Sequence, residues 1–305
     1  MSFALRKILT SMNKEGLIIK GVGGIYTVLS QGESYACTAK GVFRNRDITP
    51  LVGDSVEISV MDEAKKIATL HTINPRTNQL RRPAAANISQ VIITIAAAEP
   101  PFNPGLLDRL LLLVEDEDIP ILICVNKRDL GFRKSMFEPY EQAGYEIVYT
   151  QTIGDVFVED LRQAMSGKLN LFAGPSGVGK SSLINALIPN LQLETGGLSK
   201  KISRGKHTTR HTEIFPLGAT AEAGYCFDTP GFTALDISHI KKENLGYLYR
   251  EFRLFIPDCK FANCLHHKEI DCAVKANVGK AIHPERHESY LRLLKNEGKY
   301  EDSNR

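Results

Sequence analysis

Residues 169–187 read LNLFAGPSGVGKSSLINAL, and this stretch decides the fold of the region around it. Its apolar start, residues 169–173, is typical of a buried β-strand, and its end has the apolar spacing of a helix. Between them, residues 174–181 fit G-x-x-x-x-G-K-[ST] at every fixed position. A glycine-rich turn that matches by chance is the alternative, but a phosphate-binding loop requires the strand before it and the helix after it. The sequence therefore predicts a nucleotide-binding α/β domain.

The residue types in this loop suit a bound nucleoside triphosphate. Glycines let the backbone curve so that its N–H groups point at phosphate oxygens, and the helix N-terminus adds positive potential. We expect Lys180 to reach the β- and γ-phosphates and to assist hydrolysis, and the Ser181 hydroxyl to bind Mg²⁺. The residues of this segment predicted to contact the nucleotide are Gly174, Pro175, Ser176, Gly177, Val178, Gly179, Lys180, Ser181 and Ser182.

The tetrapeptide NKRD, residues 126–129, follows the apolar run ILICV and predicts which base is bound. It lies at the carboxyl end of a predicted strand, where α/β sheets bind ligands. A carboxylate can accept hydrogen bonds from the N1–H and N2–H₂ of guanine, and adenine lacks these donors, so Asp129 would select guanine. Asn126 would brace the loop, and the Lys127 stem would cover the base. Thr150 starts a second candidate base loop after the next strand, although its residues are unspecific.

The segment DTPG, residues 228–231, follows another apolar run and predicts a sensor of the γ-phosphate. Asp228 would hold the water shell of Mg²⁺, and the Gly231 N–H would bond the γ-phosphate and be released on hydrolysis. By itself, this segment would be interpreted as a turn. Upstream of it, Thr209, which we favour over Thr208, would complete the coordination of Mg²⁺.

The residue after Gly231 is Phe232, where related sites often have a glutamine that orients the attacking water. A phenylalanine cannot orient water by hydrogen bonding, so we expect slow intrinsic turnover and a different water-orienting group. His207 is the best local candidate, because imidazole can orient or deprotonate water. Contact of His207 with RNA or solvent is an equal alternative.

These motifs occur in a rotated order along the chain. Residues 126–129 precede residues 174–181, whereas in ordinary Ras-like GTPases the phosphate loop comes first. The rotation also connects the DTPG segment directly to the C-terminal region, so movement of the segment on hydrolysis would pull on that region. In this order the chain resembles the circularly permuted GTPases, and more specifically the ribosome-small-subunit-dependent GTPase A family, RsgA.

The resemblance covers almost the whole chain and implies more than the motifs do. It implies an N-terminal OB-fold, binding to the 30S ribosomal subunit and its 16S rRNA, and a role in late maturation of that subunit. It also implies GTPase activity stimulated by the subunit, and we expect hydrolysis of GTP to GDP and phosphate to time release from it. The chain departs from the family at residues 150–151, which read TQ where the family usually shows Ser-Ala.

A cluster of cysteine and histidine residues near the C-terminus predicts a metal site. Cys259, Cys264, His266 and Cys272 form a Cys₃His set, the composition of closed, structural Zn²⁺ sites. Soft thiolate ligands favour zinc over Mg²⁺ or Ca²⁺. The spacing differs from the usual C-x₂-C pattern, and His267 is the neighbouring alternative to His266. The resemblance to RsgA places ligands at the same four positions.

The remaining segments predict a multi-domain protein. Short strands and turns without helices suggest a small N-terminal β-barrel, and alternating strands and helices after residue 90 suggest a parallel sheet. A basic, proline-containing connector would be a solvated hinge or a phosphate contact, and the C-terminal helix with Arg286 would face phosphate or solvent. The predicted division is an OB-fold-like barrel (residues 1–75), a linker (76–89), a circularly permuted P-loop GTPase core (90–237) and a mostly helical zinc-binding domain (238–305).

Composition sets the broad class of the protein. With 43% hydrophobic and 24% charged residues, the chain is globular rather than disordered. It has no apolar run of about 18–20 residues that would span a membrane, and residues 1–14 lack the pattern of a secretory signal. A frayed N-terminus is preferred there over an amphipathic transit peptide. We expect a cytoplasmic monomer.

Other functions remain open on the sequence alone. The leading hypothesis is a Mg²⁺-dependent GTPase that acts on the 30S subunit. The first alternative is a GTP-dependent switch protein that acts on a non-ribosomal RNA or protein partner. The second is a zinc protein that binds nucleic acid and has a vestigial nucleotide site, which the intact phosphate loop argues against.

Overall fold

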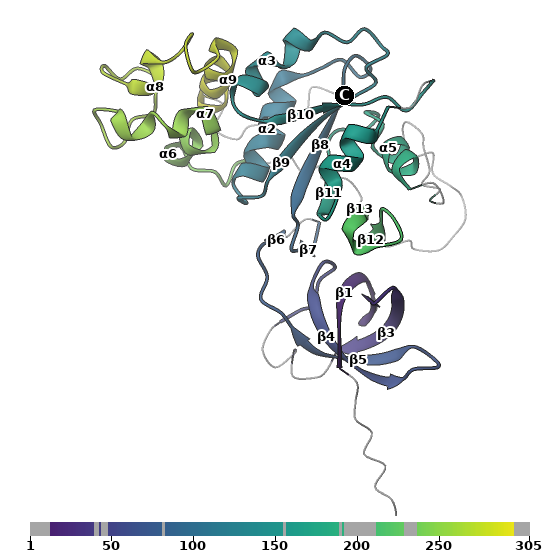
Figure 1. The fold of residues 1–305 in the computed structure, drawn as a ribbon. Coiled ribbons are helices and arrows are strands. Elements are labelled where there is room, and N and C mark those ends of the chain that lie inside the picture. Colours follow the sequence, from purple (N-terminus) through teal and green to yellow (C-terminus); the bar gives the residue numbers. More distant parts are fainter. Residues whose placement is uncertain are drawn as a thin grey trace, which may run out of the picture.

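The computed structural model describes residues 13–39, 43, 48–80, 83–154, 157–188, 191, 212–228 and 237–295. Figure 1 shows a β-barrel, an α/β core and a group of short helices at the far side of the core. This arrangement confirms the predicted multi-domain fold class.

The N-terminal barrel has five strands, β1 (Asn13–Val22), β2 (Ile25–Ser30), β3 (Glu33–Ala39), β4 (Ser55–Asp62) and β5 (Ile67–Ile73). They pair in the order β1-β2-β3-β5-β4, and β1 pairs again with β4, which closes the sheet. Only the β3–β5 pair is parallel among these pairings. Alternate residues such as Ile18, Tyr35 and Ile58 are fully buried inside. Closure leaves no unpaired barrel edge, and the predicted OB-fold-like barrel is confirmed.

The connector after the barrel is fixed in place by side chains. Arg76 donates to both carboxylate oxygens of the buried Asp54, at 2.7 and 2.8 Å. The Asn78 amide pairs with the backbone N–H and C=O of Ile88, at 2.9 and 2.8 Å. A short hairpin of β6 (Gln79–Leu80) and β7 (Ala85–Ala86) lies between these contacts. The predicted roles of a solvated hinge or a phosphate contact therefore do not apply to Arg76, because its guanidinium pairs with Asp54 inside the protein.

The core is a sheet of five parallel strands and one antiparallel strand. The parallel strands are β8 (Gln90–Ala96), β9 (Ile121–Asn126), β10 (Glu146–Tyr149), β11 (Leu169–Ala173) and β13 (Tyr225–Asp228), in the order β10-β9-β8-β11-β13. β12 (Glu213–Pro216) pairs antiparallel with β13 and, on its other side, with β1 of the barrel.

Helices cover both faces of this sheet. Alternate residues of its strands point to opposite faces, and both sets are apolar and buried by helices. Ile93 packs in the cluster that contains apolar residues of α2 (Pro104–Glu115), and Ile92 packs in the cluster of α4 (Glu159–Met165) and α5 (Lys180–Leu187). The 3₁₀ turn η1 (Lys134–Phe137) and α3 (Glu138–Gln142) lie between β9 and β10, and the turn η2 (Ala221–Ala223) precedes β13. Strands and helices therefore alternate along the core, as the sequence predicted for an α/β domain.

The C-terminal region is built from short helices around a third hydrophobic cluster. These are α6 (Lys242–Leu245), α7 (Arg250–Arg253), α8 (Ala273–Ala276) and α9 (Pro284–Lys295), with 3₁₀ turns η3 (Gly246–Leu248) and η4 (Ile256–Asp258). At its centre Tyr249 stacks on Phe252, and Tyr290 meets both rings edge-to-face. Leu112 of α2 belongs to the same cluster, so the region is docked on the core.

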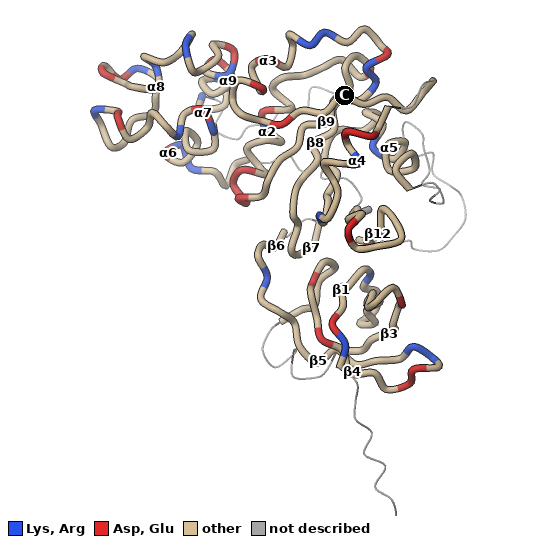
Figure 2. The backbone as a smooth tube through the Cα atoms, viewed as in Figure 1, with Lys and Arg blue, Asp and Glu red and all other residues tan. Residues whose placement is uncertain are grey.

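A buried ion network reinforces this docking and corrects one prediction. Arg286 on α9 donates to Asp108 of α2 and, at 2.6 Å, to Glu251 of α7. Arg286 faces neither phosphate nor solvent, because its charge compensates two buried carboxylates. Elsewhere in this region Figure 2 shows residues of both charge signs.

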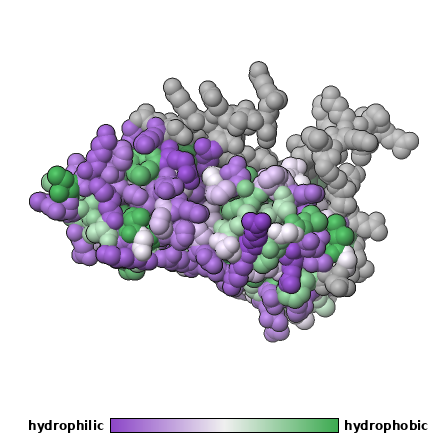
Figure 3. All heavy atoms as spheres, turned by 90° about the horizontal axis from the view of Figure 1, so that it is seen from above, coloured by the Kyte–Doolittle hydropathy of each residue, from purple (hydrophilic) through white to green (hydrophobic). Residues whose placement is uncertain are grey.

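The visible surface is mainly hydrophilic, with apolar side chains in separate patches (Figure 3). Within the described part of the chain, no helix combines the length and the apolar character that crossing a bilayer demands.

Candidate functional site

The phosphate loop joins the carboxyl end of β11 to the start of α5, as predicted. Gly174 has φ +134°, and a Cβ there would lie 2.1 Å from the carbonyl oxygen of Thr94. Gly179 has φ +96°, and a Cβ there would lie 2.3 Å from the side-chain nitrogen of Asn126. Glycine is therefore required at both ends of the loop, for its backbone conformation and for the close approach of neighbours.

Lys180 begins α5 and turns back into the curve of the loop. Its ammonium group donates to the carbonyl oxygens of Gly174 and Pro175, at 2.8 and 2.7 Å. Desolvation by burial lowers the pKa of Lys180 to about 8. Ser181 and Ser182 follow in the first turn of α5 and are half-buried. The cation, the hydroxyls and the helix N-terminus thus lie together where an anion is favoured.

The base motif touches the phosphate loop directly, although 50 residues separate Lys127 from Gly177. The buried Asn126 donates to the carbonyl oxygen of Val178 at 2.9 Å, and Lys127 donates to that of Gly177 at 2.8 Å. Asp129 is exposed just beyond these two residues. The structure therefore brings the base motif and the phosphate loop together at one end of the sheet, despite their rotated order.

Two further groups support this contact, and the sequence motifs did not indicate either role. The Thr150 hydroxyl is buried and donates to the Asn126 side-chain oxygen at 3.1 Å. This hydrogen bond ties the side chain of Thr150 to that of Asn126. Lys127 also donates to the carbonyl oxygen of Glu99 at 2.5 Å. The contact with Glu99 could not be predicted, because a backbone carbonyl has no signature in the sequence. For Thr150 the available signal was its position directly after a strand.

The predicted switch residues fall largely outside the described part of the chain. His207, Thr208, Thr209, Gly231 and Phe232 are outside it. The backbone of Asp228 ends β13, beside β11, which places it at the same sheet edge as the phosphate loop. The proposed roles of these residues stay predictions.

The Cys₃His residues converge on one point and could hold a metal ion. The ligand atoms of Cys259, Cys264, His266 and Cys272 all lie within 4.8 Å of one another. The His266 Nδ1 lies 3.6 Å from the Cys259 Sγ and 3.5 Å from the Cys272 Sγ, and these two sulfurs are 3.9 Å apart. His266, rather than His267, therefore belongs to the cluster.

The surroundings of the cluster suit metal ligation. Burial lowers the pKa of His266, which keeps its imidazole in the neutral form that binds metals. The backbone N–H of Lys275 donates to the Cys272 sulfur at 3.4 Å, and Tyr290 donates to the Leu265 carbonyl beside His266. Such outer contacts orient metal ligands.

Comparisons with known proteins agree with this fold and arrangement. The family model described as RsgA GTPase matches residues 73–238, and the model described as RsgA N-terminal domain matches residues 15–67. Small ribosomal subunit biogenesis GTPase RsgA of Alkaliphilus metalliredigens (strain QYMF) is 41% identical over 285 residues, covering 92% of this chain and 96% of the relative. The protein of the same name from Geobacillus sp. (strain WCH70) is 43% identical over 287 residues, covering 92% and 96%.

Solved structures give the same result for the fold. The crystal structure of YloQ, described as a circularly permuted GTPase, superposes with a TM-score of 0.78 at 34% identity, covering 96% of this chain and 98% of that one. The crystal structure of YjeQ from Thermotoga maritima superposes with a TM-score of 0.79 at 29% identity, covering 95% and 100%. The predicted circular permutation of the core is confirmed.

Proposed function

This chain belongs to the RsgA GTPase family, and we propose that it acts in biogenesis of the small ribosomal subunit. It is a GTP hydrolase, as the family is. Its relatives are named small ribosomal subunit biogenesis GTPases and match it over nearly their whole length. In the proposal, the GTP-bound protein binds the 30S subunit late in maturation, and hydrolysis to GDP and phosphate times its release.

The contact between the base motif and the phosphate loop is the observation that carries the nucleotide part of this proposal. Asn126 and Lys127 are hydrogen-bonded to Val178 and Gly177, which supports the proposal that one guanine nucleotide would contact both Asp129 and Lys180. Asp129 would then read the base while the loop holds the phosphates. Thr150 would keep Asn126 in position through its hydrogen bond.

Hydrolysis would proceed by attack of water on the γ-phosphate. Lys180 would stabilise the charge on the transferring group, and Ser181, Thr209 and Asp228 would hold Mg²⁺. When bound, Mg²⁺ neutralises charge on the β- and γ-phosphate oxygens. His207 would orient the water, and the Gly231 N–H would report the presence of the γ-phosphate.

We propose that the metal at the Cys₃His cluster is zinc. Bond lengths of about 2.3 Å to sulfur and 2.0–2.1 Å to nitrogen give tetrahedral edges of roughly 3.8 Å between sulfurs and 3.5–3.6 Å between sulfur and nitrogen. The observed separations of 3.9, 3.6 and 3.5 Å are close to these edges. The ion would stabilise the C-terminal region, since four protein ligands leave no position for substrate.

The partners follow from the proposed activity. The barrel and the C-terminal region would contact 16S rRNA, mostly through its backbone and shape. A monomer working on ribosomal subunits in the cytoplasm is the simplest form of this proposal.

A turnover assay with purified components tests the function. We expect slow GTP hydrolysis by the protein alone and faster hydrolysis with isolated small subunits, but not with large subunits. Lys180→Ala should abolish both rates. The proposed partner is wrong if small subunits neither stimulate hydrolysis nor co-sediment with the protein in the presence of a non-hydrolysable GTP analogue.

A further inference from the structure

The barrel and the core meet at β12, a strand that lies between two predicted switch segments. β12 pairs with β13 on one side and with β1 on the other, so one sheet runs from the core into the barrel. In Figure 1, β12 lies on the side of the core that faces the barrel, and it is β12 that pairs with β1. In sequence, β12 begins four residues after Thr209, and its partner β13 ends at Asp228.

A single row of cross-strand partners crosses this junction. Lys20 of β1 lies opposite Glu213 of β12, and Glu213 lies opposite Asp228 of β13. The Lys20 Nζ donates to the Glu213 carboxylate at 2.7 Å, with side chains 41% and 30% exposed. Lys20 therefore compensates the charge of Glu213 from the barrel side of the junction.

A second contact comes from the barrel loop before β4. Gly53 has φ +96°, and a Cβ there would lie 2.1 Å from the Ala86 carbonyl oxygen and 3.1 Å from the Phe227 ring. Phe227 immediately precedes Asp228 in β13. The barrel backbone is thus packed against the strand that carries the predicted magnesium ligand.

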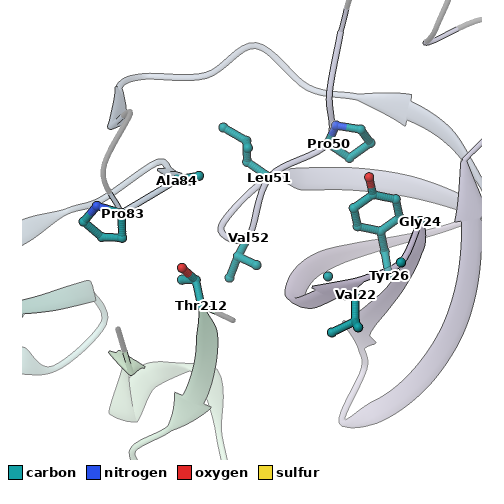
Figure 4. Close-up of a pocket in the computed structure, with 11 residues that line it drawn as sticks. Val22, Gly24, Tyr26, Pro50, Leu51, Val52, Pro83, Ala84 and Thr212 are labelled. Atoms are coloured by element: carbon teal, nitrogen blue, oxygen red, sulfur yellow. The ribbon is translucent and has the colours of Figure 1, made fainter. Parts of the chain in front are cut away.

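Beside these contacts the junction is open. A cleft of about 440 Å³ lies between the β1–β2 turn, residues 50–52 of the barrel, residues 83–84 of the connector and Thr212. Figure 4 shows Thr212 at the start of the core strand and Val52 on the barrel side. The Lys20–Glu213 pair and the Gly53 packing therefore join the barrel to the switch strands, together with the β1–β12 pairing and a shared apolar cluster that contains Ile214 and Phe227.

We propose that Lys20 and Glu213 are a positioning pair through which the barrel and the nucleotide state of the core influence each other. A change in ligation at Asp228 shifts β13 and its partner β12, and the ion pair carries the shift to β1. Coupling between two sites is reciprocal. A partner that displaces the barrel therefore changes nucleotide affinity, and the nucleotide changes the affinity of the barrel for that partner.

Hydrogen exchange on the full-length protein tests the pair without any ribosome. In the wild type, peptides covering β1 and β2 should exchange at different rates with GDP and with a non-hydrolysable GTP analogue. The difference should shrink in Lys20→Glu and in Glu213→Lys, and it should return in the double charge swap. Lys65→Glu reverses a charge elsewhere on the barrel, in an exposed pair with Asp62, and should leave the difference intact.

Two results would overturn the proposal. One is a wild-type protein whose β1–β2 exchange does not depend on the nucleotide. The other is a double swap that behaves as the sum of the two single variants, because restoration requires that the two charges act on each other.

A second experiment extends the inference to the small subunit and rests on the proposed function. The ratio of stimulated to unstimulated turnover should fall about two- to fivefold in each single variant, the scale of a partly exposed ion pair, and recover in the double swap. If small subunits do not stimulate turnover of the wild type, the proposed function is wrong. The hydrogen-exchange experiment then tests the Lys20–Glu213 pair by itself. Stimulation that is equal in the wild type and both single variants contradicts the pair.

Discussion

Replacing Arg286 by methionine should undock the C-terminal region from the core. The change keeps most of the apolar stem of the side chain and removes the guanidinium. That group donates to Asp108 of α2 and Glu251 of α7, and it lies over the Tyr249 ring at 4.6 Å. The variant therefore breaks the buried network that joins three helices while keeping similar volume.

The structure sets the size of the effect. The side chains of Arg286 and Asp108 are 2% exposed, and that of Glu251 is 3% exposed, so water cannot replace the lost interaction. Removing one partner of a buried ion pair costs about 3–5 kcal/mol. Because two carboxylates lose their compensating charge here, we expect a value in the upper part of that range.

The matched control lies on the same helix. Glu288 pairs with Arg292 at 4.0 Å on the exposed face of α9, so Glu288→Gln should cost about 0–1 kcal/mol. Urea unfolding followed by circular dichroism, with hydrogen exchange of α9 peptides, gives both values. A loss below about 1 kcal/mol in Arg286→Met, equal to the control, would refute the reasoning, since the network would then contribute no more than a surface pair.

Three other predictions concern the two sites. Burial lowers the pKa of Lys180 to about 8, and bound phosphates favour its charged form. Above pH 8, GDP binding should therefore take up a proton, and GDP affinity should fall by up to about tenfold per pH unit. Calorimetry at several pH values checks this, and Lys180→Arg should lack the dependence, since an arginine stays charged. Cys264→Ser should lower the content of the bound metal, proposed to be zinc, and unfold the C-terminal region. Cys37→Ser in the barrel should retain one equivalent of the metal, as measured by mass spectrometry. Equal metal content in both variants would contradict the site. Thr150→Val leaves the buried Asn126 oxygen without its donor, which should lower the free energy of unfolding by about 1–3 kcal/mol. Because Asn126 then loses its fixed position, GDP affinity should also fall, by at most about 150-fold, and recover in Thr150→Ser. Unchanged affinity in the valine variant would exclude the positioning role.

The parts of the site that the sequence predicted are those in which chemistry dictates residue types at fixed spacing. The phosphate loop needs glycines, a lysine and a hydroxyl in a strand–loop–helix setting, and residues 169–187 show all of these. The Cys₃His set is similar, because few other functions need three thiols and an imidazole in 14 residues. The buried strands could be predicted as well, since residues 90–96 are buried on both faces of the sheet.

Contacts between distant segments could not be predicted in this way. Arg286 has the sequence surroundings of a solvated helix face, and only its pairing with Asp108, 178 positions away, explains its burial. The sequence around Arg76 likewise suggests an exposed side chain, because its partner Asp54 lies in a separate segment, the barrel. The hydrogen bond from Thr150 to Asn126 likewise depends on strand order rather than on local pattern.

The most direct test of the central claim is the base preference of Asp129→Asn. If Asp129 and Lys180 hold one nucleotide, the wild type binds GDP and discriminates against xanthosine diphosphate, whose O2 is an acceptor where guanine has a donor. An asparagine amide can donate to that O2, so the variant should lose GDP affinity and gain affinity for xanthosine diphosphate, while Lys180→Ala weakens both. A variant that binds GDP as tightly as the wild type and still rejects xanthosine diphosphate would show that the base is read elsewhere.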